Sequence, residues 1–102
     1  MRIAVFELFY LECFILFLQL DADIPLGWHA ADGDRVAAVA LLCHIEGAAR
    51  TLVSAERSAL NFLQMLSGTA TATATYVDAL RGTRTTILDT RKTLPGLRLA
   101  QK

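Results

Sequence analysis

A short run near the C-terminus carries the residue types best suited to binding an anion. Thr90, Arg91 and Lys92 follow one another, between Asp89 and Thr93. An arginine offers a planar fork of donors that matches a carboxylate, and a lysine offers a compact point charge. Two cations beside two hydroxyl groups therefore suit a ligand with several carboxylate or phosphate oxygens. A cluster of exposed salt bridges is the alternative interpretation of the same residues.

A second cation stands out by its place in a predicted helix. The pattern predicts a helix that begins at Ser54 as N-cap, which puts Arg57 in the first turn, where the helix dipole disfavours a positive charge. Either Glu56 offsets a solvated guanidinium, or Arg57 points at an anion bound near the helix N-terminus. His29 and His44 have no partner at ligand or triad spacing, and the sequence contains no G-x-S-x-G or G-x-x-x-x-G-K motif.

Composition indicates a small domain that needs additional covering. The chain has 102 residues, of which 54% are apolar, above the ~45–50% of ordinary globular chains. This excess predicts that more chain or a second subunit covers part of the surface. The net charge is zero, but residues 81–102 carry six bases against one acid. Such a basic end indicates a phosphate, carboxylate or nucleic-acid ligand, or else a solvated positive face.

The first 20 residues are apolar enough to raise the question of a membrane segment or a secretion signal. Glu7 and Glu12 argue against both, because a carboxylate at the bilayer centre costs ~2.5–3.5 kcal/mol. The uncharged run from Cys13 to Leu18 is also shorter than the apolar part of a signal peptide. We therefore expect either a buried helix here or residues assigned upstream of the true reading frame. Cys13 and Cys43 form no CxxC pair and are expected to be buried thiols in a reducing compartment.

The middle of the chain predicts a small β unit followed by helices. A strand is expected at residues 24–30, a turn at Asp32-Gly33-Asp34, and one or two short strands at residues 36–45. A helix is expected from Ser54 to a stop at Gly68. Its apolar face would comprise Ala59, Leu60, Leu63 and Leu66, with Phe62 and Met65 packing on a second side.

The last third of the chain predicts the front half of a βα unit. A second helix is expected at residues 70–80, a strand at 85–89, and the start of a helix at 97–102 after Pro95-Gly96. The Thr90–Thr93 segment then lies directly after the strand. In parallel sheets and barrels this is the edge at which ligands bind.

Four blocks of sequence, in this order, resemble the quinolinate phosphoribosyltransferase family, the carboxylating nicotinate-nucleotide pyrophosphorylases. They are W-H-x-x-D-G-D at 28–34, I-E-G at 45–47, A-R-T-L-V-S-A-E-R-S-A-L-N-F-L-Q-M-L-S-G at 49–68 and I-L-D-T-R-K-T-L-P-G-L-R at 87–98. Two long motifs in the right order are highly specific. The resemblance covers residues 13–102.

The resemblance implies a reaction and a set of partners. Quinolinate and phosphoribosyl pyrophosphate, with Mg²⁺, give nicotinate mononucleotide, pyrophosphate and CO2 in NAD synthesis. Thr90, Arg91 and Lys92 would occupy the quinolinate-binding loop after the first barrel strand. Arg57 would reach into the active site of a neighbouring subunit, which implies a homodimer. No nucleic acid is implied as a partner, and a cytoplasmic location is expected.

The resemblance also implies an α/β fold class and a domain organisation. Residues 1–20 would be an apolar leader of uncertain status, and 21–82 part of an α+β N-terminal domain with connecting helices. Residues 83–102 would begin an incomplete (β/α) barrel. Residues 1–12 stay unexplained. Val39 stands where the family usually has glycine, which costs ~1–2 kcal/mol if the backbone there is left-handed.

The catalytic residues and the acids that bind magnesium and phosphoribosyl pyrophosphate are expected downstream of Lys102. We therefore expect this chain to be inactive by itself. Two alternatives remain open. The chain could be a non-catalytic fragment that pairs with a complementary chain, or a membrane-associated peptide led by residues 1–20.

Overall fold

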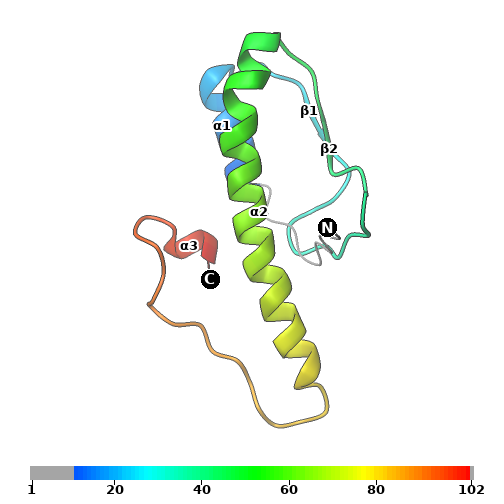
Figure 1. Ribbon diagram of the computed structural model, residues 1–102, viewed down its shortest axis with the longest axis vertical. Coiled ribbons are helices and arrows are strands. Elements are labelled where there is room, and N and C mark those ends of the chain that lie inside the picture. The colour runs from blue at the N-terminus through cyan, green and yellow to red at the C-terminus, as the bar shows by residue number, and fades with distance from the viewer. Residues whose placement is uncertain (1–10, 102) are drawn as a thin grey trace.

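One long helix runs the length of the molecule, with two shorter helices against it and a two-stranded hairpin to one side (Figure 1). The computed structural model describes residues 11–101. The elements are, in order, α1 (Leu11–Leu20), β1 (Leu26–Trp28), β2 (Cys43–Ile45), α2 (Ala49–Ala79) and α3 (Arg98–Gln101). At 1.5 Å per residue the 31 residues of α2 span about 46 Å, close to the longest dimension of the molecule, 51 Å.

The core lies between α1, the two strands and the N-terminal half of α2. Phe17 of α1, Ile24 of the following loop, and Ala55 and Ala59 of α2 are all buried and in contact. Partly buried side chains surround them: Leu16, Leu18, Leu26, Trp28, Ile45 and Leu52. The helix expected in the leader is present as α1, but among residues 15–20 only Phe17 is buried, whereas Ile15 and Leu20 are exposed; residues 1–10 lie outside the described residues.

The β unit is a two-stranded antiparallel hairpin with a long connection. Leu26 pairs with Ile45, Gly27 with His44 and Trp28 with Cys43. The strand expected at residues 24–30 is confirmed in its centre. The expected turn is confirmed as well, since the Asp34 amide donates to the Ala31 carbonyl at 3.1 Å.

The strands expected across residues 36–45 are confirmed only for Cys43–Ile45. Residues 36–42 form a loop, in which the Ala40 amide donates to the Ala37 carbonyl at 3.2 Å. Val39 sits at the tip with φ 64°, and its side chain is fully exposed. A β-branched residue in this left-handed conformation is strained, because its side chain crowds the backbone. The left-handed position that the family glycine suggested is therefore present.

A single helix replaces the two that the sequence predicts. The prediction of an N-cap at Ser54 is wrong, because α2 already begins at Ala49, after Ala48. The prediction of a stop at Gly68 is wrong as well, because a helix interior tolerates one glycine at a cost of ~1 kcal/mol.

The run of alternating threonine and alanine continues α2 past Gly68. Each of four threonine hydroxyls donates to the carbonyl four residues earlier, at 2.7–3.1 Å: Thr69, Thr71, Thr73 and Thr75. These bonds satisfy the hydroxyls inside the helix, so they do not compete for backbone groups elsewhere. Ala70 and Ala74 are buried between them. The helix expected at residues 70–80 is therefore confirmed as the last part of α2.

The buried face of α2 is lined by smaller residues than the sequence suggested. Ala59 and Leu66 are each 1% exposed, as expected, but Leu60 is 44% exposed. The remaining buried positions are Ala55, Ser67, Ala70 and Ala74.

The strand predicted at residues 85–89 does not form. These residues are exposed and adopt neither helix nor strand. An extended segment becomes a strand only when a neighbour accepts and donates its backbone hydrogen bonds, and none of the residues 11–101 pairs with this one. The short helix α3 confirms the predicted helix start after Pro95-Gly96. Within the same described range, no helix is long and apolar enough to cross a membrane.

Three charged side chains connect the loop between β1 and β2 to the C-terminal end of α2. Asp78 contacts Arg35, 43 residues earlier, at 2.9 Å and Arg81 at 2.8 Å. The hydrogen bond from Arg35, followed by the charges of both arginines, lowers the pKa of the Asp78 carboxyl below its ordinary value of 3.8. The loop around Arg35 is thereby held against the C-terminal end of α2.

Replacing Val39 with glycine is expected to stabilise the protein. Glycine adopts φ 64° without strain, a gain of ~1–2 kcal/mol, from which its greater unfolded-state freedom subtracts ~0.5–1 kcal/mol. Urea unfolding of V39G should show a free energy of unfolding about 1 kcal/mol higher. V39A is the control, because it keeps the Cβ atom that causes the strain. Equal stability of V39G and the parent would contradict the assigned backbone strain.

Asp78 should make stability depend on acid pH. A carboxyl whose folded pKa is lowered contributes stability that is complete above its unfolded pKa and disappears as pH falls through the folded pKa. The free energy of unfolding should therefore decrease below about pH 3.8 in the parent. D78N should be less stable than the parent at pH 6 and should lose less on acidification. Parallel pH profiles for the two proteins would show that the Arg35–Asp78–Arg81 cluster is not formed in solution.

Candidate binding site

Arg57 lies deeper in its helix than the sequence suggested. Because α2 begins at Ala49, Arg57 is eight residues along, more than two turns from the N-terminus. The prediction that it stands in the first turn is therefore wrong, and Glu56 is not a first-turn acid either. The helix dipole acts mainly within the first turn, so it no longer opposes the charge of Arg57.

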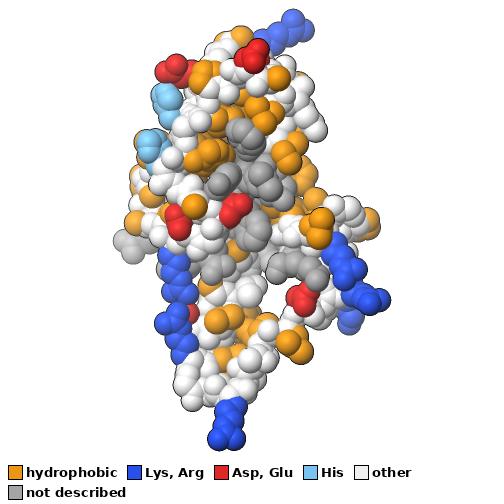
Figure 2. Space-filling view, turned by 180° about the vertical axis from the view of Figure 1, so that it is seen from behind, with side chains coloured by type: hydrophobic (Ala, Val, Ile, Leu, Met, Phe, Trp, Pro, Cys, Tyr) orange, Lys and Arg blue, Asp and Glu red, His pale blue; other side chains and the backbone are white. Residues whose placement is uncertain are grey.

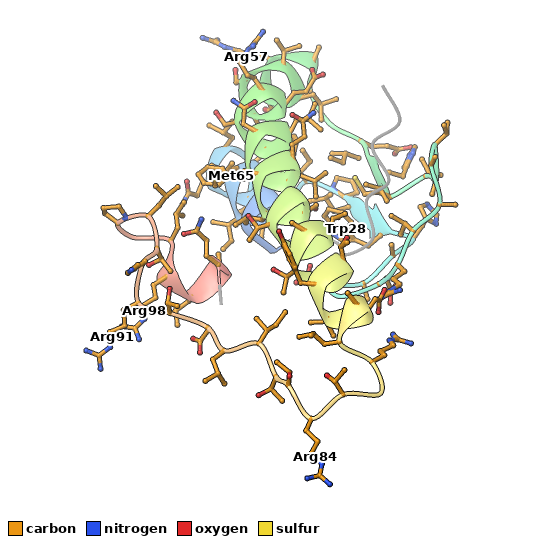
Figure 3. The ribbon with its side chains drawn as sticks, turned by 60° about the horizontal axis from the view of Figure 1, so that its bottom comes forward. Trp28, Arg57, Met65, Arg84, Arg91 and Arg98 are labelled. Atoms are coloured by element: carbon orange, nitrogen blue, oxygen red, sulfur yellow. The ribbon has the colours of Figure 1, made fainter. Side chains whose placement is uncertain are left out.

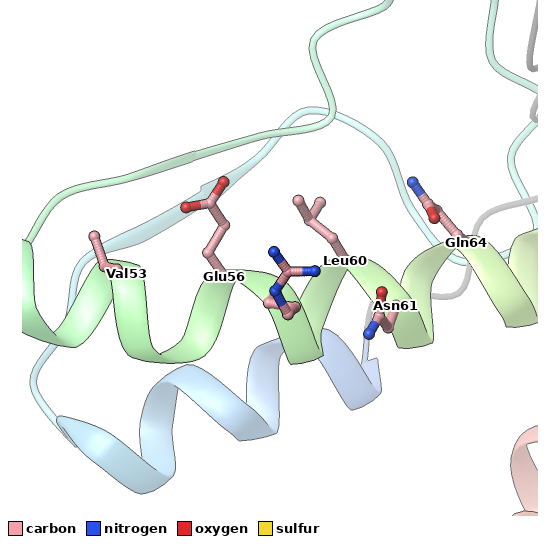
Figure 4. Close-up of a pocket in the computed structure, with 6 residues that line it drawn as sticks. Val53, Glu56, Leu60, Asn61 and Gln64 are labelled. Atoms are coloured by element: carbon pink, nitrogen blue, oxygen red, sulfur yellow. The ribbon is translucent and has the colours of Figure 1, made fainter. Parts of the chain in front are cut away.

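A shallow polar groove surrounds Arg57 on the exposed face of α2. It has a volume of about 350 Å³ and is lined by Val53, Glu56, Arg57, Leu60, Asn61 and Gln64 (Figure 4). One cation and one anion face it, so its formal charge is zero. None of its four polar side chains has a hydrogen-bond or ion-pair partner within residues 11–101. The groove thus offers free donors and acceptors on a partly apolar floor.

The segment from Thr90 to Lys92 is an exposed turn. The Lys92 amide donates to the Thr90 hydroxyl at 3.2 Å, and the Thr93 amide donates to the Arg91 carbonyl at 3.0 Å. The hydroxyl of Thr90 therefore shapes the backbone of the turn. The side chains of Arg91 and Lys92 are both exposed. Solvent-facing cations on an ordered turn remain available to an anionic ligand.

The end of this segment is held by α3. The Leu94 amide donates to Oε1 of Gln101 at 2.8 Å, across the Pro95-Gly96 turn. Gly96 has φ 80°, a conformation that favours glycine, and the Leu97 amide donates to the Leu94 carbonyl at 3.0 Å. These bonds fold residues 94–101 into one compact unit.

A second groove, mainly apolar, joins that unit to α2. It has a volume of about 360 Å³ and is lined by Ser58, Asn61, Phe62, Met65 and Leu97. Phe62 and Met65 thus face a second side of α2, as the sequence predicted. Asn61 lines both grooves and stands on the ridge of α2 between them.

The structure does not bring the predicted site residues together within this chain. Figure 3 shows Arg57 near the N-terminal end of α2, at the top of the view, whereas Arg91 projects well away from it at the lower left, from the segment before α3. In the space-filling view, arginine and lysine side chains line the edges of the molecule and its lower tip, with apolar groups between them (Figure 2). Arg57 and the Thr90–Lys92 turn are therefore two separate half-sites.

The histidines and the cysteine of the hairpin form no metal or redox site. His44 contacts Glu46 at 3.0 Å on the exposed surface. Burial raises the pKa of the Cys43 thiol, which keeps it protonated and unreactive at neutral pH. The thiol of Cys43 is half-buried, so the expectation of a buried thiol is met only in part. In the part of the chain that is described, no group of three His, Cys, Asp or Glu side chains could hold a metal ion.

Sequence reasoning singled out Arg57 but missed the polar residues that share its groove. Asn61 and Gln64 follow Arg57 by four and seven residues, a spacing that places all three on one helix face. That spacing was the available signal. The apolar residues between them predict the buried face of the helix, and they do not indicate which polar residues share the exposed face.

The chain matches two family models over nearly its whole length. The model for the quinolinate phosphoribosyl transferase N-terminal domain matches residues 9–67, and the model for the C-terminal domain of the same family matches residues 69–102.

Individual relatives and solved structures agree with this match. The chain is 49% identical over 75 residues to the nicotinate-nucleotide pyrophosphorylase [carboxylating] of Mycobacterium leprae, covering 74% of this chain and 26% of that protein. It is 42% identical over 88 residues to quinolinate phosphoribosyltransferase [decarboxylating] 1 of Nicotiana glauca, covering 86% and 25%. The solved nicotinate-nucleotide pyrophosphorylase of Francisella tularensis superimposes with a TM-score of 0.86 at 43% identity, covering 92% of this chain and 34% of that one. The chain thus spans about a quarter of the length of the curated relatives it matches.

The bond between Gln101 and Leu94 should control the order of the turn region. Q101A removes the acceptor, so hydrogen exchange of the Leu94 amide, followed by NMR, should accelerate about three- to tenfold, as expected for one hydrogen bond worth ~0.5–1.5 kcal/mol. Q101E keeps the acceptor oxygen and is the matched control. Unchanged exchange in Q101A would mean that Gln101 does not hold this segment.

Proposed function

The chain belongs to the quinolinate phosphoribosyltransferase family of NAD biosynthesis, and on this premise we propose that it supplies two parts of a quinolinate site. The reaction proposed for the complete enzyme joins quinolinate to phosphoribosyl pyrophosphate. It yields nicotinate mononucleotide, pyrophosphate and CO2. The observation that carries the proposal is the exposed, internally bonded turn of Thr90, Arg91 and Lys92.

The chemistry of the turn fits the proposed substrate. Quinolinate carries two adjacent carboxylates on a pyridine ring. Arg91 can hold one carboxylate through paired N–H donors, and Lys92 supplies a second charge beside it. Cations fixed in this way align the ring nitrogen with the sugar and stabilise the charge that develops during transfer. The proposed role of Thr90 is to shape the turn, since its hydroxyl accepts the Lys92 amide.

The separation of the two half-sites supports a dimer. Arg57 and Arg91 lie far apart on one chain (Figure 3), so one bound ligand would meet both only if two chains contributed. We therefore propose that Arg57 completes the quinolinate site of a neighbouring subunit. A homodimer then follows as the functional unit.

Membership of the family also implies a magnesium ion and a barrel domain for the complete enzyme. Magnesium would neutralise the pyrophosphate charge, but the residues from 11 to 101 include no metal-binding group of acids, so no step here involves it. The segment at residues 85–89 would become the first barrel strand once a neighbouring strand pairs with it. A domain boundary at residues 82–83, after α2 has ended, is part of the proposal, whereas the two family matches meet inside α2.

A second candidate function is a non-catalytic role in which this chain pairs with a complementary chain. It is favoured by large apolar side chains on the C-terminal segment, where Leu88 is 80% and Leu99 91% exposed. Such side chains gain ~1.5–3 kcal/mol each when another surface covers them. Isolation of a stable complex with a polypeptide that carries the barrel would distinguish this role from a free-standing one.

Quinolinate should bind the turn in the purified chain. In a ¹⁵N NMR titration with quinolinate, the amides of Arg91 and Lys92 should shift. The double variant R91A/K92A should bind about tenfold more weakly, because it loses two exposed charged contacts worth up to ~1 kcal/mol each. R84A is the control, since Arg84 is an exposed arginine of the same segment outside the motif.

Two results would contradict the proposal. One is an equal loss of affinity in R84A, which would indicate only a general attraction of anions to the basic segment. The other is formation of nicotinate mononucleotide from quinolinate, phosphoribosyl pyrophosphate and Mg²⁺ by this chain without any other polypeptide. The proposal expects no product from the chain alone.

A further inference from the structure

Asn61 lies one helical turn after Arg57 and lines both grooves of α2. It follows Arg57 by four residues, so the two side chains lie on the same face of α2 with their Cβ atoms about 5–6 Å apart. Both line the polar groove of about 350 Å³, and Asn61 also lines the second groove, which Leu97 closes from the C-terminal segment. No other contact within the described chain occupies its amide group.

The chemistry of the pair is complementary. A carboxylate that binds the guanidinium of Arg57 through two parallel hydrogen bonds still has free lone pairs. The amide of Asn61 has two N–H donors within one helical turn and adds a hydrogen bond without adding charge. We propose that Asn61 is a further substrate-binding residue, which binds with Arg57 the same carboxylate of the ligand. This inference rests on the proposed function, because it takes the ligand of Arg57 to be quinolinate.

Glu56 gives the groove a preference among anions. Its carboxylate lines the same groove as Arg57 (Figure 4), so the formal charge there is zero rather than positive. A phosphate group concentrates about 1.5 to 2 negative charges on one centre at neutral pH, whereas each carboxylate of quinolinate carries one, so a phosphate would be repelled more strongly by Glu56. A single carboxylate needs one cation and neutral donors, which Arg57 and Asn61 supply. The groove is therefore a carboxylate subsite and not a phosphate subsite.

The test is an NMR titration of the full 102-residue chain, with quinolinate in one series and inorganic phosphate in the other. Quinolinate should shift the side-chain signals of Arg57 Nε–H and Asn61 NH2 together, and phosphate should shift neither. N61A should raise the Kd of this groove for quinolinate about three- to tenfold, the effect of one hydrogen bond. N61D should weaken binding further, because it places a second acid in the groove.

A matched control separates this pair from the groove as a whole. Gln64 carries the same amide group and lines the same groove, but it stands about 10 Å beyond Arg57 along the helix axis. Q64A should raise the Kd less than N61A does, because its amide lies farther from Arg57. Both positions, 61 and 64, are exposed, so circular dichroism should show the parent helix content in each variant.

The outcomes distinguish the inference from the proposed function. If quinolinate shifts Arg57 while Asn61 stays unshifted and N61A keeps the parent Kd, the inference is overturned and the proposed function stands. If quinolinate shifts neither Arg57 nor the Thr90–Lys92 turn, the proposed function itself is overturned. Equal shifts with phosphate at Arg57 and Asn61 would overturn the carboxylate preference.

Discussion

The close contact between α1 and α2 is the interaction on which the rest of the structure depends. Phe17 reaches the surface of α2 because Ala55 and Ala59, one turn apart, leave space for its ring, and all three side chains are at most 4% exposed. Ile24 fills the remaining corner, where a Cβ atom added to Gly47 would lie only 3.0 Å from its Cδ1 atom. Larger residues at these positions would overfill the contact, at a cost of ~1–3 kcal/mol each. The hairpin closes because this contact fixes both of its ends.

The uninterrupted course of α2 then decides where the charged residues lie. The helix passes Gly68 and the threonine-rich run without a break, since each threonine hydroxyl is bonded within the helix. A break at Gly68 would have let the second half fold back beside the first. Because the helix continues to Ala79, the C-terminal segment begins at the far end of the molecule, and only its last part, α3, returns to α2. The length of α2, and not the distance in sequence, therefore separates Arg57 from the Thr90–Lys92 turn.

The sequence allowed prediction of those features that depend on local chemistry. The turn at Asp32-Gly33-Asp34 and the centre of the first strand follow from residue types over a few positions, and the structure has them. The left-handed position of Val39 was suggested only by the resemblance to the family, and the structure has it as well. The start of α2 was misplaced, because Ala48 makes no side-chain cap that a pattern could reveal and Ser54 resembles a cap. The strand at residues 85–89 was wrong for another reason: pairing is a property of two segments, and β-branched composition describes only one. In the site, Arg57 was identified but Asn61 and Gln64 were not. These two residues can be recognised as lining the groove of Arg57 only when it is known which face of α2 is exposed.

The two half-sites also explain why charge and apolar surface occur together on the outside of this chain. An anion bound at Arg57 alone would keep most of its charge in water, where one exposed contact contributes ~1 kcal/mol or less. A second chain that brings further cations to the same ligand strengthens these contacts only if it also excludes water. Apolar side chains around the cations exclude that water. Leu60 and Val53 beside Arg57, and Leu88 and Leu94 around the Thr90–Lys92 turn, are exposed at the positions that such a contact would cover. In the proposed dimer the same burial would therefore stabilise the pairing of the chains and strengthen the binding of the carboxylates.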